Sequence, residues 1–254
     1  MERGSETDAF RLARARVRAR IAEACERSGR DPGSVTLVAV SKTVPPERLR
    51  DALAAGIDLL GENRVQEALA KMPDVPGARW HLIGPLQSNK ARRAAEAFEV
   101  IETVDSVDLA RRLDRIVREL DRAALPVLLQ VNVDRDPSKA GFSPAQLGPA
   151  LDSVAGLDRL DVRGLMTIGR LVERPADARA TFAGLRDLAG ALRAAGAALG
   201  PELSMGMSDD YPLAVEEGAT IVRVGRALFG ERPHAHEPGD DALHRHGPDD
   251  RHLP

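Results

Sequence analysis

The sequence predicts a single (β/α)₈ TIM-type barrel of the α/β class, with an extra N-terminal helix and a disordered C-terminal tail. Short, β-rich apolar segments alternate about eight times with amphipathic helical segments, which is typical of α/β proteins with a parallel sheet. The apolar segments are continuous rather than alternating, so both faces of each strand are expected to be covered. No Gly-x-Gly-x-x-Gly turn follows the first strand, which disfavours the alternative of an open doubly wound sheet.

One domain is expected over residues 1–232, followed by a disordered polar tail over residues 233–254. A chain of 254 residues is long enough for one large barrel. Its 43% hydrophobic and 30% charged residues are typical of a globular protein with a sizeable core. From Pro233 onward the residues are polar and lack periodicity. Five of the six histidines lie in this tail, where a solvated segment is more common than a metal site.

The first element is expected to be a helix from about Thr7 to Ser28. Phe10, Ala13, Val17, Ile21 and Cys25 recur in it at helical spacing and predict one buried stripe. Because Cys25 is the only cysteine, it cannot form an intrachain disulfide, and its place on the stripe predicts a core role.

The strands are expected where the chain is apolar and rich in β-branched residues. They are Val35–Val40, Ile57–Leu60, Trp80–Ile83, Val100–Val104, Val127–Val133, Val162–Ile168, Leu203–Met207 and Ile221–Val224. The clearest helices between them are Val107–Leu120 and Ala178–Leu192, each with one apolar stripe. Another helix opens at Ser143, with proline at its first position and Gln146 at its third to close a capping box.

Composition argues against several classes of partner. A net charge of -3 and an aromatic content of 3% give no support for nucleic-acid binding. No apolar run approaches the length needed to cross a bilayer, and the N-terminal residues lack the apolar stretch of a signal peptide. A single cysteine suits a reducing compartment. A cytoplasmic protein without a membrane partner is therefore expected.

Lys42 is the most informative residue of the chain. Only four of the 36 Lys and Arg residues are lysine, and Lys42 follows the first buried strand directly. Lysine offers an amine that becomes nucleophilic on losing its proton, as in Schiff-base chemistry. The alternative is a strand-end lysine that extends to water. This segment alone leaves the two interpretations equally open.

The carboxyl ends of the other strands, where active sites of barrels lie, carry amides, hydroxyls, glycines and other residues. They include Asn63, Met166, Thr167, Ser208, Arg223, Gly225 and Arg226. No cluster of carboxylates and histidines is found among them, which disfavours metal-assisted hydrolysis.

The last two strand ends resemble an anion cradle. Ser204–Ser208 offers hydroxyls and a glycine turn, and Arg223–Gly230 offers a second glycine turn with two guanidiniums. Barrel enzymes often hold phosphate between these two loops, although such glycines can also be ordinary turns. Asp209 and Asp210 are expected to cap the next helix and to point away. A lysine on the first strand opposite this cradle is an arrangement suited to pyridoxal 5′-phosphate (PLP).

Six stretches of the chain are similar to one known family. They are Val38-Ala-Val-Ser-Lys-Thr43, Gly61-Glu-Asn-Arg-Val-Gln-Glu67, His81-Leu-Ile-Gly-Pro-Leu-Gln-Ser-Asn-Lys90, Gly164-Leu-Met-Thr167, Ser204-Met-Gly-Met-Ser-Asp-Asp210 and Val222-Arg-Val-Gly-Arg-Ala-Leu-Phe-Gly230. With them the chain resembles the pyridoxal phosphate homeostasis proteins, also called proline synthetase co-transcribed homologues. The resemblance implies the barrel of the alanine racemase N-terminal domain without its second β domain.

The resemblance also implies residue roles. Lys42 looks like the Schiff-base lysine, and Ser208 with the backbone around Gly225 and Arg226 resembles the phosphate grip. Arg223 matches the arginine that faces the pyridine nitrogen. A guanidinium does not readily give up a proton, so the ring nitrogen should stay unprotonated and PLP should be a weak electron sink.

Other positions carry weaker implications. Asn63 and Met166 match positions that line the cofactor site. His81 is as well explained as a hydrogen-bonded structural histidine as by a functional role. The family often has glutamate where this chain has Gln146, with little effect expected, and commonly a small residue where Arg226 stands. Arg226 therefore either reaches the phosphate or points to solvent.

The expected function is PLP homeostasis, namely storage, buffering or delivery of PLP through a Schiff base to Lys42, with PLP-dependent apoenzymes as possible recipients. A robust reaction is not expected, because racemases of this fold take an acid/base tyrosine from their second domain. This chain has one tyrosine, Tyr211, beside the seventh loop. The alternatives are a minimal PLP-dependent amino-acid racemase and a PLP-sensing adaptor. A monomer is expected.

Overall fold

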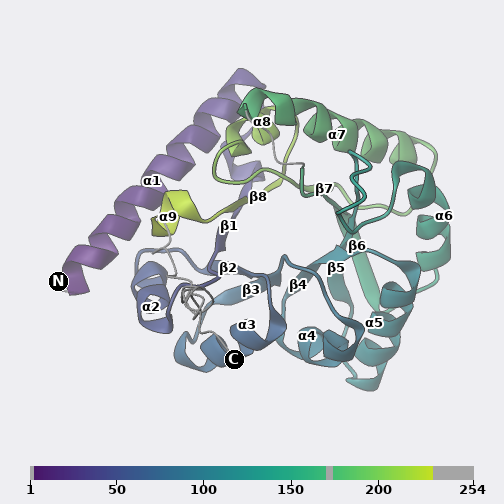
Figure 1. Cartoon of the computed structure of the whole chain (residues 1–254), viewed down its shortest axis with the longest axis horizontal. Helices are drawn as coiled ribbons and strands as arrows, with labels where there is room; N and C mark the ends of the chain where they lie inside the picture. The colour runs from purple at the N-terminus through teal and green to yellow at the C-terminus, as the bar shows by residue number, and fades with distance from the viewer. Residues whose placement is uncertain (1–2, 170–173, 231–254) are drawn as a thin grey trace, which may run out of the picture.

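Eight parallel strands close into a barrel, and the strands follow one another around it in chain order (Figure 1). The computed structural model describes residues 3–169 and 174–230. The predicted fold class is confirmed. The expected tail over residues 233–254 lies outside the described residues, so the tail and the domain boundary stay predictions.

The strand bounds agree with the apolar segments to within a few residues. The strands are β1 (Thr36–Val40), β2 (Leu59–Glu62), β3 (Arg79–Leu82), β4 (Val100–Val104), β5 (Leu125–Gln130), β6 (Leu160–Met166), β7 (Glu202–Ser204) and β8 (Ile221–Val224). The expected bounds of β4 and β8 are confirmed. The expected bounds of β7 were wrong, since it ends three residues before Met207. Gly206 adopts a φ of 90°, which turns the chain out of the sheet there.

The helices lie outside the barrel. They are α1 (Arg3–Arg27), α2 (Pro46–Ala54), α3 (Val65–Lys71), α4 (Ala91–Ala97), α5 (Val107–Glu119), α6 (Pro144–Val154), α7 (Arg179–Ala194), α8 (Tyr211–Glu216) and α9 (Arg226–Phe229). The capping box of α6 is confirmed, with the Gln146 Oε1 accepting the Ser143 backbone N–H at 3.0 Å. Among the described residues, no helix is long and apolar enough to cross a membrane.

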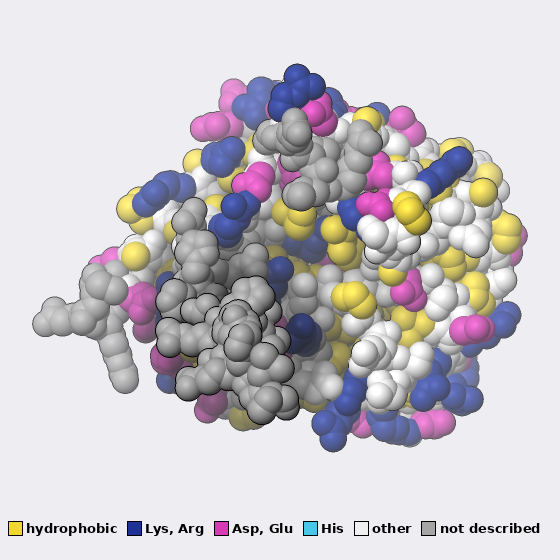
Figure 2. Space-filling model, viewed as in Figure 1, with side chains coloured by type: hydrophobic (Ala, Val, Ile, Leu, Met, Phe, Trp, Pro, Cys, Tyr) yellow, Lys and Arg dark blue, Asp and Glu magenta, His cyan; other side chains and the backbone are white. Residues whose placement is uncertain are grey.

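Helix α1 lies between α2 and α8 on the side of the barrel formed by β1 and β8, and it packs against α2, α8 and α9 (Figure 1). Its predicted stripe is confirmed at Phe10, Val17, Ile21 and Cys25, which are all buried, whereas Ala13 is half-buried. Phe10 meets Phe229 of α9 edge to face, with ring centroids 5.7 Å apart. The coloured part of the face in Figure 2 carries basic side chains interspersed with acidic ones.

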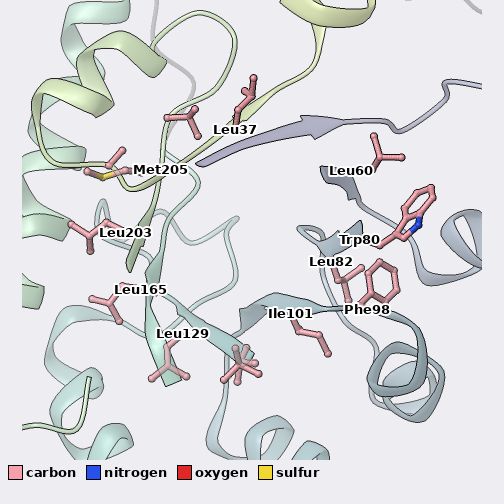
Figure 3. Packing of buried hydrophobic residues seen from close by; sticks show 14 of the residues in the cluster. Leu37, Leu60, Trp80, Leu82, Phe98, Ile101, Leu129, Leu165, Leu203 and Met205 are labelled. Atoms are coloured by element: carbon pink, nitrogen blue, oxygen red, sulfur yellow. The ribbon is translucent and has the colours of Figure 1, made fainter. Parts of the chain in front are cut away.

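Side chains alternate between the two faces of the strands. The outward-facing ones form the larger core beneath the helices, where Trp80, Leu82 and Phe98 lie close together (Figure 3). The inward-facing ones form a smaller apolar cluster inside the barrel. Its members are Val38, Leu59, Ile83, Leu128, Met166 and Ile221. This inner cluster fills part of the barrel interior, and polar side chains of the same strands lie beside it.

Candidate functional site

A pocket of about 300 Å³ opens where β1 and β8 end. Five of the residues predicted from sequence line it, which are Lys42, Ser208, Arg223, Gly225 and Arg226. The strand order explains this, because β8 pairs directly with β1 and brings the last loop beside the first. Residues far apart in sequence thus meet at one mouth of the barrel.

Lys42 continues the inward-facing side of β1. Val38 lies in the inner apolar cluster and Val40 lines the pocket, so Lys42, two residues further on, is placed at the mouth. Its side chain is half-buried, and within the described part of the chain no hydrogen bond or ion pair holds its amine. The amine is therefore free to react with a molecule in the pocket.

The seventh and eighth loops are bonded to each other. The Gly206 carbonyl accepts the Arg223 backbone N–H at 3.0 Å. The Ser208 hydroxyl accepts the Gly225 N–H at 3.2 Å, just before α9 begins. These bonds place a hydroxyl and the glycine turn before α9 side by side at the pocket wall, an arrangement that suits an anion.

Asp210 occupies the N-cap position of α8, but its side chain makes no cap hydrogen bond there, so the expected capping by the Asp209 and Asp210 side chains was wrong. The Asp210 carboxylate reaches back along the loop and accepts the Met207 N–H at 2.6 Å. Asp209 forms an ion pair with Arg226 across the pocket rim. Burial raises the pKa of Asp210. Both carboxylates therefore hold the loop rather than the helix.

Arg226 and Arg48 contribute two further cations to the pocket lining. Arg226 is exposed and is engaged by Asp209, so its guanidinium lies at the rim rather than deep in the pocket. Arg48 was not predicted from the sequence. It donates to the Phe229 carbonyl at 3.2 Å and its guanidinium lies over the Phe10 ring, 5.4 Å from the centroid.

The floor of the pocket is polar and buried. The Arg223 Nη1 donates to the Ser204 hydroxyl at 2.6 Å, and the Nη2 donates to the Thr167 carbonyl at 2.8 Å. Ser204 donates in turn to Glu102 Oε2 at 2.5 Å, and His81 Nδ1 lies 2.7 Å from the other oxygen, Oε1. His81 is thus a hydrogen-bonded member of a chain that supports Arg223.

Electrostatics explain why this chain can be buried. Burial lowers the pKa of the Arg223 guanidinium, and the negative charge of Glu102 opposes that effect. Burial alone would raise the pKa of Glu102, but the bonds from His81 and Ser204 and the nearby Arg223 charge hold it below its ordinary value. The charges of the carboxylate and of the guanidinium therefore compensate each other in the interior.

Asn63 and Met166 lie outside the pocket lining. Met166 is fully buried in the inner apolar cluster at the end of β6. Asn63 is half-buried after β2, and its carbonyl is so close to Gly84 that a Cβ there would lie 2.3 Å from it. Contact of either residue with a ligand stays a prediction.

Gly206→Ala is expected to destabilise the protein by about 1–3 kcal/mol. An added Cβ would lie 2.5 Å from the Ala214 Cβ and 2.9 Å from the Tyr211 Cα, and the φ of 90° is strained for alanine. Urea unfolding measures the change. Gly190→Ala in α7 is the control, since nothing lies within 4 Å of its Cβ, and it should stabilise by about 0.5–1 kcal/mol. Equal effects of the two substitutions would contradict the prediction.

Comparison with known proteins agrees with this geometry. The family model for the N-terminal domain of alanine racemase matches residues 13–233. The pyridoxal phosphate homeostasis protein of Pseudomonas aeruginosa is 46% identical over 222 residues, which cover 86% of this chain and 94% of that protein. The chain belongs to this family. The homeostasis protein of Aquifex aeolicus is 40% identical and covers 85% of this chain and 96% of that protein.

Solved structures extend the comparison. PipY of Synechococcus elongatus, determined with PLP bound, is 48% identical, covers 83% of this chain and all of that chain, and has a TM-score of 0.74. The alanine racemase of Clostridium difficile is only 15% identical, with a TM-score of 0.66, and shares the fold alone. This chain matches 57% of that racemase.

In this pyridoxal phosphate homeostasis family member, the sequence placed Glu62 at the end of the second strand but gave it no role, and the buried carboxylate of Glu102 was missed. Glu62 ends β2 and Glu102 lies within β4, and both are fully buried. The signal was present, because each is a carboxylate in an otherwise apolar strand. A buried carboxylate requires partners, and these lie on other elements: Ser41 and Lys71 of α3 for Glu62, and His81 and Ser204 of other strands for Glu102.

Proposed function

We propose that this protein binds PLP through Lys42 and serves PLP homeostasis by storing, buffering or delivering it. The observation that carries the proposal is a single pocket lined both by the Lys42 side chain, whose amine has no hydrogen-bond partner among the described residues, and by Ser208 and Gly225, which are hydrogen-bonded to each other. The PLP-bound structure of PipY and the names of the curated relatives support it.

The residues of the pocket fit PLP chemically. A cavity of about 300 Å³ suits a small aromatic ring with a phosphate. Lys42 would supply the amine, the Ser208 hydroxyl and the turn around Gly225 and Arg226 would hold the phosphate, and Arg223 would face the pyridine nitrogen. Bound PLP would supply an electrophilic aldehyde carbon, and the Lys42 amine would form a C=N bond to it with loss of water.

We propose further that the protein carries PLP rather than catalysing a robust reaction. Tyr211, its only tyrosine, is fully buried on α8 and is absent from the pocket lining. The Arg20 guanidinium lies over its ring, 5.2 Å from the centroid, which directs the ring toward α1. Tyr211 is therefore badly placed for the acid/base role that racemization requires. Arg223 also disfavours carbanion chemistry, since a buried guanidinium does not protonate the ring nitrogen.

The test of PLP binding is reduction of the loaded protein with borohydride, followed by peptide mass mapping. The chain has only four lysines, so the site of attachment can be assigned among Lys42, Lys71, Lys90 and Lys139. Stoichiometric labelling of the Lys42 peptide is expected. Labelling spread over the other three lysines would contradict the proposal.

The test of delivery is reactivation of a PLP-dependent apoenzyme by the loaded protein, compared with free PLP at the same concentration. Measurable transfer without loss of the carrier's fold is expected. The competing function, a minimal racemase, is measured by exchange of the α-hydrogen of alanine or serine in deuterated solvent. Turnover comparable to that of an enzyme would replace the carrier function, whereas ligand-dependent capture of one partner would favour an adaptor.

A further inference from the structure

A buried ion cluster lies directly behind the Lys42 turn. It consists of Glu62 at the end of β2 and of Glu67 and Lys71 on α3. The Lys71 ammonium is 7% exposed as a residue and donates to three acceptors, the Glu62 Oε1 and Glu67 Oε1 at 2.8 Å and the Ser41 carbonyl at 2.9 Å. An ammonium has three donors, so Lys71 is fully satisfied.

The cluster is hydrogen-bonded to both sequence neighbours of Lys42, Ser41 and Thr43. On one side, the Ser41 hydroxyl donates to Glu62 Oε1 at 2.7 Å and the Ser41 carbonyl accepts from Lys71. On the other side, the Thr43 backbone N–H donates to Glu67 Oε1 at 2.7 Å. Lys42 alone of the three keeps a side chain free within the described residues.

The held turn is strained. Thr43 has a φ of 64°, which is uncommon for a non-glycine residue and unfavourable for a β-branched one. Such a conformation persists only where the surroundings over-determine it. The hydrogen bond from the Thr43 N–H to Glu67 and the bonds made by Ser41 hold the backbone in this conformation.

The two carboxylates share one ammonium unequally. Burial raises the pKa of Glu62 despite its bonds from Lys71 and Ser41. For Glu67 burial acts in the same direction, but the Lys71 ammonium and the Thr43 N–H outweigh it and lower the pKa. Glu67, whose pKa is lowered, is also the carboxylate that accepts the Thr43 N–H.

We propose that Glu62, Glu67 and Lys71 are positioning residues that fix the turn on both sides of Lys42 and aim its amine into the pocket. The inference rests on the proposed function. Condensation requires the amine and the aldehyde carbon to meet in one geometry, and a group that is already held there reacts faster than one that must be ordered first. None of the three side chains lines the pocket itself.

The test compares Glu67→Ala with Glu67→Gln. The Glu67 side chain is 28% exposed, so both variants are expected to fold, which thermal unfolding checks. Alanine removes the acceptor for Thr43, whereas glutamine keeps an oxygen there. Gln66→Ala, an exposed neighbour on α3, controls for changes in the helix. Ser41→Ala tests the other flank by removing only the hydroxyl bond to Glu62.

Two readouts are measured. Amide exchange of the peptide containing Ser41–Val44, in protein free of PLP, should be about tenfold faster in Glu67→Ala, since the Thr43 N–H has lost its acceptor. Borohydride-trappable bonding of PLP to Lys42 should be about tenfold slower in Glu67→Ala and within about threefold of wild type in Glu67→Gln. Ser41→Ala should also slow bonding, and Gln66→Ala should match wild type in both readouts.

The outcomes separate this inference from the proposed function. Wild-type bonding rates in both Glu67→Ala and Ser41→Ala would overturn the inference while leaving PLP binding intact. Equal losses in Glu67→Ala and Gln66→Ala, or in Glu67→Ala and Glu67→Gln, would also overturn it. Wild-type protein that traps no PLP at Lys42 would contradict the proposed function, and the amide exchange would then decide the positioning of the turn by itself.

Discussion

Lys42→Ala is expected to abolish covalent capture of PLP. The other lysines are poorly placed to replace it: Lys71 is buried with three acceptors, and Lys139 donates to the carbonyls of Ile168 and Gly169. The Schiff-base absorption band and the borohydride-trapped mass should both disappear. Ser208, Gly225 and Arg223 remain in the variant, so weak noncovalent binding of PLP should persist.

Lys90→Ala is the matched control for this experiment. Lys90 is a half-exposed lysine at the end of a short 3₁₀ helix, Ser88–Lys90, and is absent from the pocket lining. Its substitution should leave both the absorption band and the trapped mass unchanged. A Lys42→Ala variant that kept a full Schiff-base band would contradict the assignment of Lys42 as the site of PLP attachment.

Glu102→Ala is expected to destabilise the protein by about 3–5 kcal/mol, the cost of leaving a buried charge unpaired. The substitution leaves Ser204 and His81 without their hydrogen-bond partner and removes the negative charge that compensates Arg223. Urea unfolding measures the loss. Glu99→Ala is the control three residues away, where an exposed pair with Arg79 should be worth only about 0–1 kcal/mol. Similar losses in the two variants would contradict a compensating role for Glu102.

Glu102 also makes the protein sensitive to acid. Its pKa in the folded state is lowered from the ordinary 4.5, so its contribution is present above pH 4.5 and is lost as the pH falls through the lowered value. Glu102→Gln binds no proton there and should show a shallower loss of unfolding free energy below pH 4.5. Burial raises the pKa values of Glu62 and Glu202, so these two groups change the unfolding free energy with pH in the opposite direction. They are present in both the wild type and Glu102→Gln, so they do not affect the difference between the two profiles. Parallel pH profiles would contradict the prediction.

Most of the fold could be predicted because its signals are local. The apolar runs of β4 and β8, the stripe of α5 and the capping box at Ser143 each lie within one short segment. Barrel closure followed from the number of strand–helix units. The end of β7 could not be predicted, because the apolar run continues past Ser204 and only the backbone turn at Gly206 interrupts the ladder.

The candidate site was predictable where it depends on strand ends. Parallel strands bring their carboxyl ends to one rim, so Lys42, Ser208, Arg223 and Arg226 could be grouped from sequence order alone. The supporting chain was not predictable, since Glu102 bridges His81 and Ser204 from three different strands. The roles of Asp209 and Asp210 were mistaken because capping is judged from the helix sequence alone, whereas Asp209 pairs with Arg226 of α9 and Asp210 accepts an N–H from Met207, three residues before it.

The pairing of β8 with β1 has a consequence for how the molecule is made. Lys42 emerges from the ribosome early, but Ser208 and Arg223 are synthesised more than 160 residues later. The pocket therefore comes into existence only when the last strand joins the first. A nascent chain, or one truncated before Ile221, would display the lysine without Arg223, Gly225 and Arg226, which complete the pocket. Ligand retention would then report that synthesis has passed the eighth strand and that the ring has closed.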